Sequence, residues 1–153
     1  MNVLFAYDGS ESADDALAAI AAIVDPHNVE AVVLCVWEPL VVQALRAERF
    51  GGPPAVPLDV AELDEQSEKQ AELLAEHGAR LAREHGYSAR GIWVADKQDV
   101  AGTILATADE LEVDLIVMGA RGLAGVRAFL GSVSNHVVQH AHRPVLVVPG
   151  KPS

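Results

Sequence analysis

Cysteine and basic residues are both scarce in this 153-residue chain. Cys35 is the only cysteine and lies in an apolar run, so there is no disulfide framework and a reducing compartment is expected. Eleven Lys and Arg residues stand against 22 Asp and Glu residues, which gives a formal net charge of −11. Partners such as DNA, RNA or an anionic membrane surface usually require a basic face, so this balance disfavours all three.

Long apolar runs and targeting signals are also missing. No run approaches the length needed to span a bilayer. Residues 1–5 lack the charged head and cleavage site of a signal peptide, so we expect a cytoplasmic protein. Half of the residues are hydrophobic, which argues against disorder, and the length suits one domain over residues 1–153.

Familiar catalytic patterns are absent as well. The chain has no G-x-x-x-x-G-K-[ST] run, no G-x-S-x-G nucleophile elbow and no visible Ser-His-Asp arrangement. His136 and His140 have a spacing that can chelate a metal ion, but no third ligand occupies a matching position, so no metal site is predicted there. The sequence therefore predicts no catalytic residues.

Short apolar runs alternate with helical patterns along the chain. Strands are predicted at residues 3–7, 29–37, 88–95, 113–119 and 144–148, and helices at residues 10–24, 59–85, 100–112 and 132–141. This alternation implies parallel strands joined by right-handed crossovers. The apolar runs imply strands that are covered on both faces. The fold class is therefore α/β, a single doubly wound domain with a five-stranded parallel sheet and helices on both faces.

Local signals refine these helices. Ser12 and Asp15 resemble a capping box for the first helix, Asp99 is a plausible cap for the third, and Gly86 is a natural stop for the second. The second helix is predicted to bury a stripe of long side chains: Leu63, Gln70, Leu74 and Leu81.

Residues 39–58 break the regular pattern, since glycine and proline gather at 51–54 and again at Pro57. A short helical turn fits within residues 40–50. So long a connection is either a lid over a binding site or a variable surface excursion, and both interpretations stay open.

Glycines after the fourth predicted strand point to a phosphate site. Gly119 and Gly122 follow an apolar run, and Gly131 with Ser132 opens the last helix. Glycine lets the backbone approach a ligand, and the first N–H groups of a helix are free to bind an anion. Ligands in doubly wound sheets bind beyond the carboxyl ends of the strands, where Asp8, Trp37 and Gly119 could share one rim.

Four motifs together resemble the universal stress protein family: YDGS at 7–10, DLIVMG at 114–119, GSVS at 131–134 and RPVLVVP at 143–149. The resemblance covers almost the whole chain. It implies the strand order 3-2-1-4-5 and a homodimer paired through the last strand. Many members of the family bind ATP, whereas others lack the glycines and do not.

The resemblance also implies which residues would hold ATP. Asp8 would accept from the ribose and could help to hold Mg²⁺, and the main chain of Val36 would meet the adenine edge. The full set of expected nucleotide-binding residues is Ala6, Tyr7, Asp8, Val36, Met118, Gly119, Arg121, Gly122, Gly131, Ser132, Val133 and Ser134.

One departure from the family pattern keeps alternatives open. The ATP-binding pattern places nine residues between its second and third glycines, whereas this chain has eight, at 123–130. The favoured hypothesis is an ATP-binding stress-response regulator with little or no hydrolysis. The alternatives are a nucleotide-free, dimeric interaction module of the same family and a weak ATPase or phosphotransferase.

Overall fold

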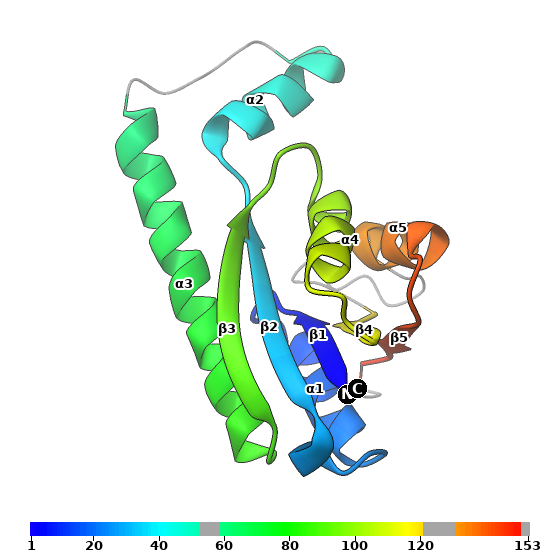
Figure 1. The fold of residues 1–153 in the computed structure, drawn as a ribbon. Helices are drawn as coiled ribbons and strands as arrows, with labels where there is room; N and C mark the ends of the chain where they lie inside the picture. Colours follow the sequence, from blue (N-terminus) through cyan, green and yellow to red (C-terminus); the bar gives the residue numbers. More distant parts are fainter. Residues whose placement is uncertain (53–58, 121–130, 151–153) are drawn as a thin grey trace.

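A single parallel sheet organises the chain in this computed structural model, which describes residues 1–52, 59–120 and 131–150. The strand order is β3-β2-β1-β4-β5, and every neighbouring pair is parallel (Figure 1). The predicted fold class and strand order are confirmed. The strands are β1 (Asn2–Ala6), β2 (Glu30–Trp37), β3 (Ser88–Ala95), β4 (Leu115–Gly119) and β5 (Val145–Val148).

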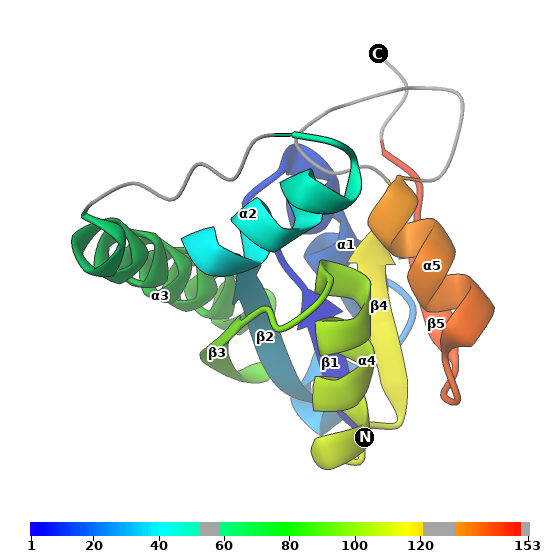
Figure 2. The same ribbon diagram turned by 90° about the horizontal axis from the view of Figure 1, so that it is seen from above.

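Helices cover both faces of this sheet, as the alternation predicted. On one face lie α1 (Glu11–Ala21) and α3 (Val60–Glu84), and on the other lie α4 (Val100–Glu110) and α5 (Ser132–His140) (Figures 1 and 2). Successive residues of β1 supply the two cores, because side chains alternate across a strand. Val3 and Phe5 pack with α1 and α3, whereas Leu4 packs with α4 and α5.

The contact between α3 and the sheet depends on small residues. The buried residues of α3 are Ala71, Ala75, Gly78, Ala79 and Ala82. A Cβ atom on Gly91 of β3 would lie 2.7 Å from the carbonyl carbon and oxygen of Ala75, so the helix backbone almost touches the strand. The predicted stripe of long side chains was wrong in part, since Gln70 is exposed. Long side chains cannot fit between backbones at this separation.

Helix ends follow capping chemistry, with one correction. Ser10, and not Ser12, caps α1, because its hydroxyl oxygen accepts the Ala13 N–H at 3.2 Å. Asp99 caps α4 by accepting the Gly102 N–H, as predicted. Gly86 follows the end of α3 with a φ of +98°, the left-handed conformation that glycine adopts without steric penalty.

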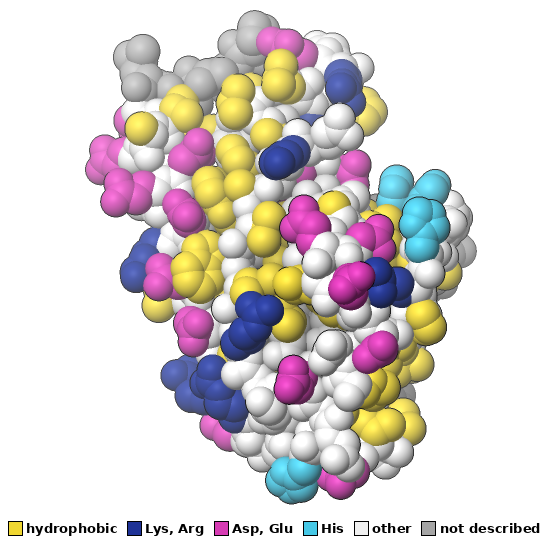
Figure 3. Space-filling view, in the orientation of Figure 1, with side chains coloured by type: hydrophobic (Ala, Val, Ile, Leu, Met, Phe, Trp, Pro, Cys, Tyr) yellow, Lys and Arg dark blue, Asp and Glu magenta, His cyan; other side chains and the backbone are white. Residues whose placement is uncertain are grey.

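The connection after β2 contains a full helix, α2 (Leu40–Arg49), where only a short turn was expected. It crosses the molecule beyond the carboxyl end of β2 (Figure 2). None of its residues is buried, and Val41 and Leu45 are 50% and 57% exposed. Figure 3 shows hydrophobic side chains on its outer surface. Residues 53–58 of the same connection lie outside the described residues.

Candidate functional site

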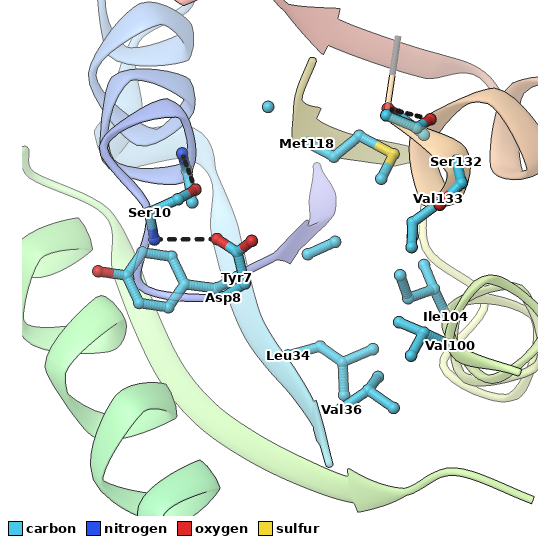
Figure 4. Close-up of a pocket in the computed structure, with 15 residues that line it drawn as sticks. Tyr7, Asp8, Ser10, Leu34, Val36, Val100, Ile104, Met118, Ser132 and Val133 are labelled. Carbon is cyan, nitrogen blue, oxygen red and sulfur yellow. Dashed lines mark hydrogen bonds between the residues drawn. The ribbon is translucent and has the colours of Figure 1, made fainter. Parts of the chain in front are cut away.

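A cavity of about 260 Å³ opens at the carboxyl ends of β1, β2 and β4, between the first turns of α4 and α5 (Figure 4). This is where a doubly wound sheet reverses its winding, the usual place for a ligand. The described lining residues are Ala6, Tyr7, Asp8, Ser10, Ala13, Leu34, Val36, Val100, Ile104, Met118, Gly119, Gly131, Ser132, Val133 and Ser134.

Most of the residues predicted from the sequence meet in this cavity. Arg121 and Gly122 lie outside the described residues, and the other ten predicted site residues all line its walls. Sequence reasoning missed the α4 wall formed by Val100 and Ile104. The signal was available, because the Asp99 cap marks where α4 begins, at the same sheet edge. Trp37 does not line the cavity and packs instead in the cluster of Cys35 and α3.

The main chain of Val36 faces the cavity with hydrogen-bonding capacity that β1 does not use. The N–H of Glu30 donates to Met1 O and the N–H of Tyr7 donates to Leu34 O, so even-numbered residues of β2 direct their polar groups towards β1. The last bridge between these strands joins Ala6 to Leu34. Among the described residues, no main-chain bond joins Val36 to β1. A donor and an acceptor are therefore presented side by side to a ligand, as a purine edge requires.

Asp8 sits in the turn between β1 and α1. Its Oδ1 accepts the Ser10 N–H at 2.9 Å, and Gly9 between them has a φ of +79°. A Cβ atom on Gly9 would also meet the Leu74 side chain at 2.8 Å. The turn thus fixes the half-buried carboxylate at the cavity wall. A carboxylate can accept several hydrogen bonds, and the Ser10 N–H uses only one of them. Asp8 can serve both the turn and a ligand hydroxyl or cation.

Gly119 has a packing role that the glycine pattern did not reveal. It ends β4, and a Cβ atom there would lie 2.3 Å from Ser12 Oγ and 2.8 Å from the Ser12 carbonyl carbon and oxygen. The absence of a side chain therefore lets α1 approach β4 beside the cavity.

The start of α5 presents N–H groups to the cavity. Gly131 is the N-cap of α5, and its N–H already donates to Ala120 O at 2.8 Å. The Ser134 hydroxyl is also in use, since it lies 3.1 Å from Gly131 O and only 3% of this residue is exposed. The N–H groups of Ser132, Val133 and Ser134 precede the first intrahelical bond and are the ones free for an anion.

Tyr7 closes the wall beneath α1. Burial and the Asp14 carboxylate raise the pKa of its hydroxyl, so the group stays protonated and donates to Asp14 Oδ1 at 2.6 Å. Burial likewise raises the pKa of the nearby Cys35 thiol to about 11, which makes it a poor nucleophile at neutral pH. Neither group is prepared for proton transfer or covalent chemistry.

A charged cluster beside the site holds α2 to the loop after β3. Arg46 donates to Glu38, to Asp96 Oδ2 at 3.0 Å and to Gln98 O at 2.8 Å. The Asp96 side chain is fully buried, and its other oxygen accepts the Gln98 N–H. No residue of α2 is among the described lining residues, so a lid function for 39–58 stays a prediction.

Within the described parts of the chain, no group of three or more His, Cys, Asp or Glu side chains is placed to hold a metal ion. Nor does any helix in those parts have the length and apolar character to cross a membrane.

The model of the "Universal stress protein family" matches residues 1–149. The chain belongs to this family. A universal stress protein of Thermus aquaticus is 35% identical over 148 residues, covering 95% of this chain and 96% of the relative. The universal stress protein YxiE of Bacillus subtilis is 32% identical over 147 residues, covering 95% and 97%. The solved structure of protein MJ0577 has a TM-score of 0.77 and 26% identity, covering 99% of this chain and 97% of that one.

More distant members of the universal stress protein family share the fold and were solved with nucleotides. An Arabidopsis thaliana protein with AMP bound has a TM-score of 0.68 at 20% identity. A protein of Archaeoglobus fulgidus in complex with dAMP has a TM-score of 0.63 at 21% identity.

Proposed function

We propose that this universal stress protein binds ATP and acts as a nucleotide-dependent regulator with slow or no hydrolysis. The observation that carries the proposal is the cavity at the winding reversal, into which the unpaired main chain of Val36 and the first N–H groups of α5 both face. The AMP and dAMP complexes of structural neighbours support a nucleotide as the ligand. The free thiol of Cys35 fits a cytoplasmic setting.

The cavity has an apolar region and a region lined by the start of α5, and we assign a different part of the ligand to each. Leu34, Val36, Val100, Ile104 and Met118 form an apolar chamber suited to a flat base (Figure 4). The whole cavity, of which this chamber is one part, measures about 260 Å³, below the roughly 300–1,000 Å³ typical of pockets for whole ligands. We place the base in this chamber and the phosphates along the start of α5, where the first N–H groups of the helix face the cavity.

Asp8 is the residue we assign to the ribose and to Mg²⁺. It is the single acidic side chain among the described lining residues, and no Lys, Arg or His stands beside it in that set. Phosphoryl transfer needs a cationic clamp and a group that orients the nucleophile, and these described walls supply only the carboxylate.

The decisive experiment compares two matched substitutions. Val100→Phe places a ring in the chamber from the first residue of α4, whereas Val60→Phe makes the same change at the first residue of α3, which does not line the cavity. Nucleotide released by heat from the purified parent is identified by mass spectrometry, and ATP affinity is measured by calorimetry. We expect Val100→Phe to abolish binding and Val60→Phe to retain it.

A parent protein that releases no nucleotide and shows no thermal shift with Mg-ATP would refute the proposal in favour of the nucleotide-free module. Equal ATP affinity in the two variants would refute the placement of the base. Multiple-turnover release of phosphate, lost in Asp8→Ala while ATP binding persists, would support the enzymatic alternative.

We also propose a homodimer through β5. Ile116 N–H donates to Pro144 O and Ala120 N–H donates to Val148 O, so even-numbered residues of β5 face β4 and Val147 directs its N–H to the free edge. Val147→Pro removes this outward donor without removing a bond to β4. Light scattering should report a dimeric parent and a monomeric, folded variant. A dimeric variant would refute the edge pairing.

A further inference from the structure

Two exposed histidines of α5 are four residues apart, a spacing that can chelate a metal ion, and the nucleotide site does not use them. His136 and His140 occupy successive turns, and their rings stack with centroids 4.3 Å apart and planes inclined by 28°. Both residues are exposed, and Figure 3 shows histidine side chains gathered on the surface near α5. Solvent and ions reach this pair directly.

A hydrogen bond prepares one of the rings for coordination. His140 Nδ1 lies 3.0 Å from the main-chain oxygen of His136. A carbonyl oxygen only accepts, so Nδ1 carries the proton, and in the neutral ring the lone pair is on Nε2. Histidines that bind metals typically donate their second nitrogen to a carbonyl or carboxylate in this way, which fixes both tautomer and orientation.

The ring separation also suits one small cation. Zinc binds imidazole nitrogen at about 2.0–2.1 Å, so two ligands of a tetrahedral ion are roughly 3.4 Å apart. The ring centroids of His136 and His140 are 4.3 Å apart and both side chains are exposed, so the two rings can turn to direct one nitrogen each at a shared ion. Imidazole suits Zn²⁺, Ni²⁺ and Cu²⁺, whereas Mg²⁺ and Ca²⁺ prefer oxygen.

We propose that His136 and His140 form a surface site for a late divalent transition metal, for which Zn²⁺ is the test ion, with water completing its coordination. His142, beyond the helix end, lies 4.0 Å from Asp109 Oδ2 and is not needed for the pair. The site is separate from the nucleotide cavity, which His136 and His140 do not line among the described residues.

The test is calorimetric titration of the full chain, treated with chelator and dialysed, with Zn²⁺ and then with Ni²⁺. We expect one ion per chain. His136→Gln and His140→Gln should each weaken binding about tenfold or more, because one imidazole alone chelates nothing. His85→Gln, an exposed histidine at the end of α3, should bind as the parent does.

Imidazole proton signals provide a second readout that does not depend on affinity. Zn²⁺ should shift the signals of His136 and His140 and leave those of His27 and His85 unchanged. Circular dichroism checks that each variant retains its helices. No saturable binding, equal affinity in the parent and both pair variants, or shifts distributed over all histidines would overturn the proposal.

Discussion

Gly119→Ala tests whether packing of α1 against β4 requires a glycine at this position. The new Cβ atom would lie 2.3 Å from Ser12 Oγ and 2.8 Å from two backbone atoms of Ser12. Ordinary contact at about 3.4 Å requires α1 to shift by roughly 0.6 Å even after the hydroxyl rotates away, and tightly packed interiors resist such shifts. The φ of Gly119 is not in the left-handed region, so the penalty comes from the clash alone.

The expected loss of unfolding free energy is about 2–3 kcal/mol, the upper part of the range for overpacking, because backbone atoms are involved. For a chain of this size, the melting temperature would fall by roughly 4–12 °C. Urea denaturation followed by circular dichroism measures the free energy.

A double-mutant cycle isolates the contact. Ser12→Ala removes the atom at 2.3 Å and leaves the backbone contacts at 2.8 Å, so Gly119→Ala should cost about 1 kcal/mol less in that background. If Gly119→Ala stays within about 0.5 kcal/mol of the parent, as surface substitutions do, the close approach of α1 to β4 is refuted.

Three further predictions concern charge. Arg46→Met leaves the buried Asp96 carboxylate without its cation. Because the Arg46 side chain is 36% exposed, we expect the free energy of unfolding, measured by urea denaturation, to fall by about 1–3 kcal/mol. An unchanged free energy of unfolding would show that the ion pair is dispensable. The Cys35 pKa is about 11 in the folded chain against 9.0 for the reference thiol, so the unfolded state loses its proton first and stability falls from pH 9 to 11. Cys35→Ala should flatten that decline in melts against pH, and an unchanged slope would contradict the assignment. Asp8→Asn removes the charge but keeps an oxygen that accepts from the Ser10 N–H and from the ribose. Calorimetry should therefore show a lower affinity for ATP in the presence of Mg²⁺ and little change in its absence. An equal loss of affinity under both conditions would exclude a role for Asp8 in holding the metal.

Sequence reasoning reached the architecture because the alternation of apolar runs and helical patterns constrains a parallel sheet so strongly. The strand order came from the resemblance to the family. The glycine and acidic motifs then located the cavity, since residues that follow parallel strands share one edge. Ser132 and Val133, at the start of α5, line the same cavity.

Features that depend on distances between elements escaped prediction. The sequence alone does not show that α3 buries its alanines and its glycine, because leucines on the same helix are equally suited to burial. The choice depends on how closely the helix packs against the sheet. The free main chain of Val36 depends on where β1 leaves the sheet, which requires the register. Ser12 resembled a cap, although its place opposite Gly119 keeps it inside α1.

Because α2 contributes no residue to the core, its position rests on polar ties such as that from the Leu40 N–H to Asp64 Oδ1 at 2.9 Å. Such a segment belongs to the least protected part of a native ensemble. Its amides will exchange with deuterium through a local opening that leaves the strands paired. The same freedom lets the position of α2 change without repacking either core.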